Sequence, residues 1–424
     1  MKNQIILFTK QFPYGHEETY LFDELEYLKK TFQTIYIVPY DEYTYIDESN
    51  RLLNDDNIKV IKLNTMHYSQ SILVKIKREF YVVKLLFLEI VFGREKISHI
   101  KRAKKLLAQL RHLYSCSVKL SDYFNQNITS SDKIVAYNYW LHRGVIISQI
   151  LKQFLHNKIV IVSRAHAYDL YHKDWLDILN IQNNLFLPFE YLKIKFCDKI
   201  FSISTHGLKH FTNYYGHLRS KFEIARLGVK DYGLLIHDEI KKDSKIVTVV
   251  TCSGIDERKR IYLMPEILSN LNFDFRWIHF GYGNLESTKK LKGEIEKYKL
   301  EHKCLLKGLT PHHEIIDFYL NNSVDLIMNL STAEGIPVSL MEAASFSIPM
   351  LATNTVGNPE IVNNENGFII EVDFSTSHVS NLLNNYFSST ENIKFKELNS
   401  RAMYNESYNA EKNYTQFANY LASL

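Results

Sequence analysis

The stretch that decides the fold is DLIMNLSTAEGIPVSLMEAASFSIPMLAT, residues 325–353. It opens on an apolar run that predicts a buried strand, and Pro349–Thr353 at its end predicts another. Between the two runs, Gly335 frees a turn. Pro337 then stands where a helix would begin, because its missing N–H is one of the donors that a helix start leaves unpaired. The order strand, tight loop, helix, strand is typical of a parallel α/β sheet.

The same stretch predicts a site for an anion. The free N–H groups of Val338 and Ser339 would point toward the carboxyl end of the sheet. Glu334 stands in the loop at the mouth of this site, and Glu342 lies inside the helix. A diphosphate at the helix terminus, with one carboxylate on each of two flanking sugars, accounts for the pattern. The alternative is a solvated helix with Glu on its polar face. The glycine and proline of the segment argue against this alternative, because they are typical of a turn and a helix start.

Residues 329–362, NLSTAEGIPVSLMEAASFSIPMLATNTVGNPEIV, resemble the donor-binding signature of family-4 retaining glycosyltransferases of the GT-B fold. In that family two glutamates separated by seven residues hold a nucleotide-sugar, and Glu334 and Glu342 have this spacing. The resemblance implies that Glu334 is catalytic. It further implies donor contacts from Gly335, Ile336, Pro337, Val338, Ser339 and Glu342.

A nucleotide diphosphate must be neutralised, and the chain contains no Asp-X-Asp pair of the kind that chelates a metal. The segment CSGIDERKR, residues 252–260, resembles the family's diphosphate-binding loop, and Lys259 falls on the family's lysine, which implies that Lys259 is catalytic. Gly254 replaces the arginine that many members carry, which leaves either Arg258 or Arg260 as the second cation. We therefore expect no metal and no other cofactor. Contacts to the leaving phosphate strengthen as the glycosidic bond breaks.

Two glycine turns that follow strands resemble family segments near the phosphates and the base. They contain Gly281 and the pair Gly308-Leu309. Glycine lets a backbone approach a ligand closely, although a glycine after a strand is often only a turn.

In the first half of the chain, the segment Arg164-Ala165-His166-Ala167-Tyr168-Asp169 resembles a further family motif, with Ala167 in place of glycine. His166, whose protonation could switch near neutral pH, is expected to reach the donor sugar, and Asp169 to orient the loop. An earlier loop carries Gly15, expected near the phosphates, and Glu18, expected to face the acceptor. Asn138 and the two aromatic residues after it are either an acceptor wall or packing residues.

Alternating strands and helices in both halves predict two domains of the α/β class, as expected for 424 residues. The resemblance implies the GT-B fold, with two facing Rossmann-like doubly wound domains and a cleft between them. The predicted parts are an acceptor-binding domain, 1–235, a nucleotide-sugar-binding domain, 236–405, and a C-terminal helix, 406–424, that crosses back to the first domain. Expected strands are 4–9, 34–39, 58–63, 133–137, 159–165 and 199–204, then 245–252, 275–280, 303–307, 325–330, 349–353 and 367–370.

Charge is concentrated between Lys75 and Lys119, where basic residues alternate with large apolar ones. This pattern fits a surface over 72–119 that rests on an anionic membrane, and it fits a pair of ordinary amphipathic helices equally well. No motif for nucleic acid accompanies the charge. The N-terminal apolar run is too short for a signal peptide, no stretch reaches the roughly 20 apolar residues of a membrane span, and the four cysteines lack pair spacing. We expect a cytoplasmic protein, peripheral on the inner face of the cytoplasmic membrane.

These observations predict a retaining, metal-independent glycosyltransferase that moves a hexose from a nucleotide-sugar to a saccharide acceptor. The relatives it resembles imply a lipid-linked acceptor and a place in bacterial capsule, exopolysaccharide or lipopolysaccharide synthesis. Two alternatives are a nucleotide-sugar epimerase of the same fold and a non-catalytic partner of a separate transferase. Retention through a covalent carboxylate intermediate and attack from the face that the nucleotide leaves both remain open.

Overall fold

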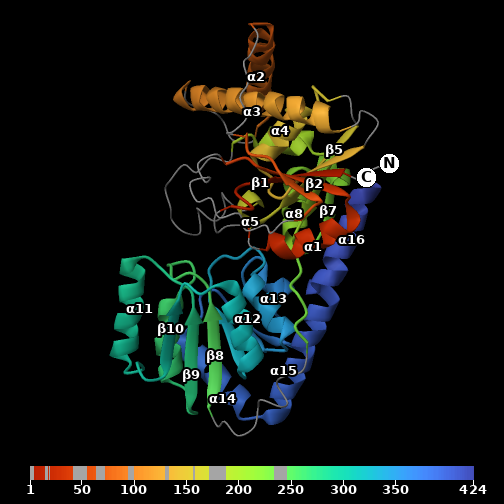
Figure 1. Ribbon diagram of the computed structural model, residues 1–424. Coiled ribbons are helices and arrows are strands. Elements are labelled where there is room, and N and C mark those ends of the chain that lie inside the picture. Colours follow the sequence, from red (N-terminus) through yellow and green to blue (C-terminus); the bar gives the residue numbers. More distant parts are fainter. Residues whose placement is uncertain are drawn as a thin grey trace. The chain divides into compact units, whose positions relative to one another are not determined.

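The computed structural model describes residues 4–14, 18, 20–41, 55–63, 72–93, 100–128, 133–155, 158–170, 188–233 and 246–424. The chain divides into two compact units. Unit 1 runs to Ala225 and takes in Tyr414–Leu424, whereas unit 2 holds Arg226–Asn413 (Figure 1). The division at Ala225 lies before the predicted boundary at 235, because Val229 already pairs with Asn409 of unit 2.

The described part of unit 1 contains a seven-stranded parallel sheet, in the order β3-β2-β1-β4-β5-β6-β7. Its strands are nearly continuous runs of apolar residues, as expected for a parallel sheet with both faces covered. They are β1 (Gln4–Thr9), β2 (Thr34–Pro39), β3 (Ile58–Val60), β4 (Ile134–Asn138), β5 (Ile159–Ala165), β6 (Lys199–Ser202) and β7 (Phe222–Ile224).

The helices of unit 1 pack on this sheet and on one another. Leu7, Tyr137 and Phe201 form part of a core to which Phe417, near the end of the chain, also contributes. The helices are α1 (Leu21–Thr31), α2 (Ile72–Phe92), α3 (Ile100–Asn127), α4 (Arg143–Leu151), α5 (Ala167–Leu170), α7 (Glu190–Phe196), α8 (Thr205–Tyr214), the 3-10 helix η3 (Gly216–Lys221) and the end of α16 (Ala410–Ser423).

Unit 2 repeats the arrangement with six parallel strands, in the order β10-β9-β8-β11-β12-β13. The strands are β8 (Val247–Cys252), β9 (Phe275–Phe280), β10 (Cys304–Gly308), β11 (Leu326–Asn329), β12 (Met350–Thr353) and β13 (Gly367–Ile370). The helices are η4 (Ile261–Leu263), α10 (Met264–Ser269), α11 (Leu285–Lys297), α12 (His312–Asn321), α13 (Val338–Ser345), η5 (Asn358–Glu360), α14 (Thr376–Phe387), α15 (Thr390–Met403) and η6 (Tyr404–Tyr408).

Both sheets therefore reverse their strand order once. The reversal lies between β1 and β4 in unit 1, and between β8 and β11 in unit 2. Loops that leave neighbouring strands in opposite directions at such a point open a crevice at the carboxyl edge of the sheet, and ligands of α/β proteins bind there. The predicted α/β class with two doubly wound sheets is thus confirmed.

Most predicted strands match the observed ones to within a few residues, and β1, β2, β5, β9 and β13 match at both ends. The sequence analysis missed β7, whose three residues at the sheet edge are too few to show a period. The predicted first helix residue, Pro337, is instead the N-cap of α13, with an extended ψ of 115°.

Candidate functional site

The loops after β8 and β11 meet at the reversal point of unit 2. Lys259, from the first loop, forms a salt bridge with Glu334, from the second, and both side chains are largely buried. The backbones of the two loops are also joined, because Thr332 N donates to Arg258 O at 2.9 Å. The parallel order β8-β11 brings these residues together although they lie far apart in the sequence. The two predicted catalytic residues of this unit thus share one site.

The Glu334 carboxylate sits in a nest of donors. Besides Lys259, its Oε1 accepts hydrogen bonds from Ser331 Oγ at 2.6 Å and from Asn329 Nδ2 at 3.2 Å. Burial by itself would raise the pKa of Glu334. Four contributions together outweigh this effect of burial and lower the pKa. They are the charge of Lys259, the hydrogen bonds from Lys259 and Ser331, and the charge of Arg258. Glu334 is therefore an anion at neutral pH, held in one orientation.

The structure separates the two arginines that the sequence left open as the second cation. Arg258 lies beside the site, with Nη1 2.9 Å from Ala333 O and 3.6 Å from Glu334 Oε2. Arg260 turns away. Its guanidinium donates to Leu330 O at 2.7 Å and to Val372 O at 2.8 Å, and it stacks on Phe374. Arg258 is thus placed to meet an anion beside Lys259, and Arg260 holds the loop in place.

The start of α13 lies directly after Glu334. Pro337 O accepts from Leu340 N at 3.1 Å, whereas the N–H groups of Val338 and Ser339 precede the first helical hydrogen bond. Ile336 and Pro337 are buried beneath the loop, and Gly335 is half-buried. The helix start therefore offers the unpaired donors that the sequence predicted for an anion.

Glu342, one helical turn further along α13, has a partner that the sequence analysis missed. His312 Nε2 lies 2.6 Å from Glu342 Oε1; the carboxylate is buried and the imidazole is about half exposed. His312 begins α12, directly after β10. The residue pattern held no signal for it, since a histidine at the start of a helix has no characteristic spacing to a glutamate in another helix.

Glycine shapes the remaining loops of this site. Gly281 has a φ of 137°, and a Cβ there would stand 1.8 Å from Ser253 O, so no side chain fits. Its N–H donates to Gly308 O at 2.9 Å, which joins the loops after β9 and β10. Leu309 is exposed on the loop after β10, and Gly254 is exposed on the loop after β8. The predicted donor-binding glycines thus lie on adjoining loops at the carboxyl edge of the sheet.

In unit 1 the loops after β1 and β4 also meet, but Glu18 has another role than the one predicted. Its carboxylate accepts from the backbone N–H groups of Lys10 at 2.9 Å, Gln11 at 2.8 Å and Phe12 at 2.7 Å, and from Trp140 Nε1 at 2.7 Å. A buried carboxylate with four donors is fully engaged. Glu18 shapes the loop and does not face an acceptor. Gly15 lies outside the described residues.

His166 and Asp169 join the loops after β4 and β5. Asp169 Oδ2 accepts from His166 N at 3.1 Å and Leu141 N at 3.2 Å, so it orients the loop, and burial raises its pKa to about 6. His166 Nε2 lies 3.0 Å from Tyr139 O, and its ring packs 4.3 Å from that of Trp140. The expected protonation switch is wrong, because burial and the Arg164 charge lower the pKa of His166 to about 3. The ring stays neutral.

Two further predicted residues of unit 1 point into its interior. Arg164 is fully buried, with Nη1 3.0 Å from Glu24 Oε2 and its guanidinium over the Phe417 ring. Asn138 is buried behind the sheet edge, where Nδ2 donates to Val162 O at 3.1 Å. Arg164 and Asn138 therefore serve packing and do not contact a ligand. Of the two alternatives for Asn138, an acceptor wall or a packing residue, the structure supports packing. Sequence reasoning failed here because residues near a strand end alternate between inward and outward directions.

Comparison with known proteins shows which family this part of the chain resembles. Residues 236–404 match the family described as glycosyl transferases group 1. The match covers nearly all of the described part of unit 2. It includes Lys259, Glu334 and Glu342.

Two curated relatives are similar over part of their length. The chain is 27% identical over 218 residues to the amylovoran biosynthesis glycosyltransferase AmsK of Erwinia amylovora, which covers 49% of this chain and 48% of AmsK. It is 30% identical over 149 residues to WcaL of Salmonella typhimurium, a protein provisionally assigned to colanic acid biosynthesis; that match covers 34% of this chain and 36% of WcaL. The matches thus span about half or less of these relatives.

Solved structures resemble the whole chain. Anabaena HepE in complex with UDP has a TM-score of 0.68 at 14% identity, and sucrose-phosphate synthase from Thermosynechococcus elongatus has 0.71 at 11%. Each comparison covers 100% of this chain, with 100% of the HepE chain and 99% of the synthase chain. The protein therefore has the GT-B fold, as its sequence predicted.

Proposed function

We propose that this protein is a retaining glycosyltransferase that moves a hexose from a nucleotide-sugar, a UDP-sugar in the first instance, to a saccharide acceptor in bacterial surface polysaccharide synthesis. The observation that carries the proposal is the Lys259–Glu334 pair at the reversal point of unit 2, beside the unpaired N–H groups that begin α13. The match of residues 236–404 to the glycosyl transferases group 1 family supports it, as do relatives named for amylovoran and colanic acid synthesis.

In the proposed mechanism the donor diphosphate takes Lys259 as its partner. Arg258 and the start of α13 supply further positive potential, so no metal ion is required. As the bond between the anomeric carbon and the phosphate oxygen breaks, the negative charge on the leaving diphosphate grows. Cations and peptide dipoles that are already in place stabilise this charge without reorganisation.

Release of Lys259 from Glu334 leaves the Glu334 carboxylate ready to accept hydrogen bonds from sugar hydroxyls. Ser331 and Asn329 still hold the carboxylate in position. The acceptor hydroxyl then attacks from the face that the nucleotide leaves. Its oxygen bonds to the anomeric carbon and its proton passes to the departing phosphate oxygen. A covalent route would instead place a carboxylate against the anomeric carbon.

The acceptor is proposed to be a lipid-linked oligosaccharide at the inner face of the cytoplasmic membrane, reached through the basic region 72–119. The support is the alternation of basic and apolar residues there. None of the helices in the described ranges is long and apolar enough to cross a membrane.

A screen of nucleotide-sugars for thermal stabilisation tests the donor proposal. A compound present at 100 times its dissociation constant adds about 2.7 kcal/mol to the free energy of unfolding. We expect a UDP-sugar to stabilise the protein without magnesium, and nucleotide release to require an acceptor saccharide. Release without acceptor, with conversion of the donor sugar, would support the epimerase alternative. An absence of stabilisation by every nucleotide-sugar would refute the donor site.

A further inference from the structure

Helix α2 presents an unusually apolar face to solvent. Phe80 is 77% exposed and Phe87 is 61% exposed, and further large apolar side chains on the helix are exposed as well. Apart from the adjacent pair at its end, successive members are spaced by three or four residues, so they share one side of the helix. We call this set the α2 stripe: Ile72, Ile76, Phe80, Val83, Phe87, Ile90 and Val91.

The opposite face of α2 fixes which way the stripe points. Val82 and Leu85 are buried there, and the helix packs on α3 and α7. Glu89 anchors this side, because its carboxylate accepts from Leu192 N at 3.0 Å and from Tyr191 N at 3.4 Å, at the start of α7. Rotation of α2 to hide the stripe would break these bonds. The stripe is therefore a second apolar face of α2, which the described part of unit 1 leaves exposed to solvent.

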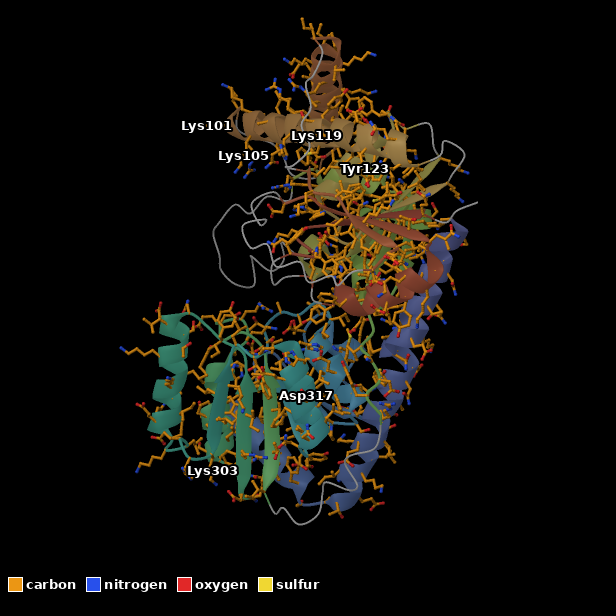
Figure 2. All side chains as sticks on the ribbon, in the orientation of Figure 1. Lys101, Lys105, Lys119, Tyr123, Lys303 and Asp317 are labelled. Carbon is orange, nitrogen blue, oxygen red and sulfur yellow. The ribbon has the colours of Figure 1, made fainter. Side chains whose placement is uncertain are left out.

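Positive charge accompanies the stripe. Lys77 and Lys84 lie on one flank of it and are exposed. The nearby carboxylate of Glu79 is engaged by Arg111 at 2.6 Å and by Arg78 at 2.9 Å, so it does not offset the lysines. Lys101, Lys104 and Lys105 are exposed at the start of α3, and Figure 2 shows Lys101 and Lys105 together near that end of the helix. A long apolar face flanked by lysines is typical of helices that lie in the membrane interface.

We propose that the α2 stripe inserts into the outer part of an anionic lipid bilayer, with Lys77 and Lys84 at the level of the phosphates. This inference rests on the proposed function, since it gives the lipid-linked acceptor a surface on which the enzyme meets it. The helix is about 30 Å long, so the stripe could bury its whole length along the membrane plane. Basic attraction alone does not explain why phenylalanine rings face outward between the lysines.

A second copy of the chain fits the stripe less well than a bilayer does. Two stripes packed antiparallel would bring the lysines of both copies to one seam, where like charges repel. Anionic headgroups instead pair with each lysine. The charge pattern therefore favours lipid.

The test is flotation of the full-length protein with vesicles of phosphatidylcholine alone and of phosphatidylcholine with phosphatidylglycerol. The variant F80S/F87S removes two rings of the stripe. A matched control, F395S/L398S, removes two exposed apolar side chains of α15 in unit 2. We expect F80S/F87S to lower partitioning to anionic vesicles by about tenfold or more, and the control to bind as wild type.

A charge variant separates the electrostatic attraction of the lysines from the apolar insertion of the stripe. We expect K77E/K84E to lower binding to anionic vesicles only, and to remove most of its salt dependence. The binding that wild type retains at high salt should be lost in F80S/F87S. The variant F80W reports insertion through the difference between its emission and that of wild type, which contains three tryptophans. This difference spectrum should shift to the blue when anionic vesicles are added.

Three results would overturn the proposal. These are wild-type partitioning by F80S/F87S, an F80W difference spectrum that does not change with vesicles, and a wild-type dimer that F80S/F87S dissociates while vesicle binding is unchanged. UDP affinity is measured on the same proteins. A chain that binds UDP but no vesicles would reject the stripe and leave the donor site standing, whereas the reverse would reject the donor site alone.

Discussion

Replacement of Glu334 by glutamine is the most direct test of the site. The change keeps the shape of the side chain and removes its charge, and it leaves Lys259 without its carboxylate partner. Ser331 Oγ and Asn329 Nδ2 lie 2.6 Å and 3.2 Å from Oε1, so a glutamine oxygen can keep these two contacts. The fold of the loop should therefore survive while the negative charge is lost.

Two effects of different size follow. Loss of one contact that strengthens in the transition state costs about 2–4 kcal/mol, which lowers turnover by roughly 30-fold to 1,000-fold. The cost in stability should be smaller, about 1–3 kcal/mol, as for a hydrogen bond to a charged group. The cost in stability is limited because the Lys259 side chain, which is 14% exposed, can turn toward water when it loses its partner; the Glu334 side chain is 8% exposed.

The assay is UDP release from a UDP-sugar at saturating donor with an acceptor saccharide present, paired with urea unfolding. Asp274→Asn is the matched control, since it breaks an ion pair of 2.6 Å with Lys303. Both residues lie just ahead of β9 and β10, at the amino edge of the same sheet, where Figure 2 labels Lys303. The control should keep full turnover. Turnover of Glu334→Gln within about threefold of wild type would refute the catalytic role of Glu334. An absence of turnover by wild type under the same conditions would favour the non-catalytic partner role.

Two further predictions concern histidines. Glu334 and Glu342 are predicted to bind the two sugars that flank the diphosphate, and we propose that Glu342, oriented by His312, binds the ribose. His312→Ala removes the contact of 2.6 Å to Glu342. By the loss of about 1 kcal/mol we expect UDP affinity to fall roughly fivefold but 2′-deoxy-UDP affinity to change less, as calorimetry would show. Equal losses for both nucleotides would contradict this role of His312. His166 has a pKa of about 3 in the folded state and about 6.5 in the unfolded state. Below about pH 6.5 the unfolded state binds a proton that the folded state does not, so the free energy of unfolding falls as the pH falls toward 3. Between about pH 7.5 and about pH 5.5 the protonation of His166 in the unfolded state should lower the free energy of unfolding by about 1.4 kcal/mol. Urea unfolding of His166→Asn should show a decrease that is smaller by this amount. A variant with the same pH dependence as wild type would contradict the prediction.

The site was predictable where its signal lies in one continuous stretch. The turn glycine, the proline and two glutamates of 334–342 locate an anion site without any tertiary information. The pairing of Lys259 with Glu334 could be expected from parallel strands, because loops at a reversal point share one edge of the sheet. The sequence could not predict which arginine accompanies Lys259. Arg258 and Arg260 differ only in the direction in which the loop points their side chains.

In unit 1 the sequence assigned several side chains to the wrong environment. Glu18 binds three backbone N–H groups, and Arg164 pairs with Glu24 in the core. Glu18 lies in the loop between β1 and α1, and Arg164 lies near the end of β5. A linear pattern interprets charged residues at such positions as ligand contacts. Burial decides otherwise, because a charged group in the interior must find its partners within the protein.

The amino-acid sequence alone therefore determined the α/β class, the order of the strands along the chain and the position of the helix start that is the candidate anion site, since these depend on local periodicity and on residues close in sequence. Only the tertiary structure decided which side chains share a site, that His166 is neutral, that His312 contacts Glu342, and that α2 has one covered and one exposed apolar face. These properties arise from contacts and burial between segments far apart in the chain, which no local pattern encodes.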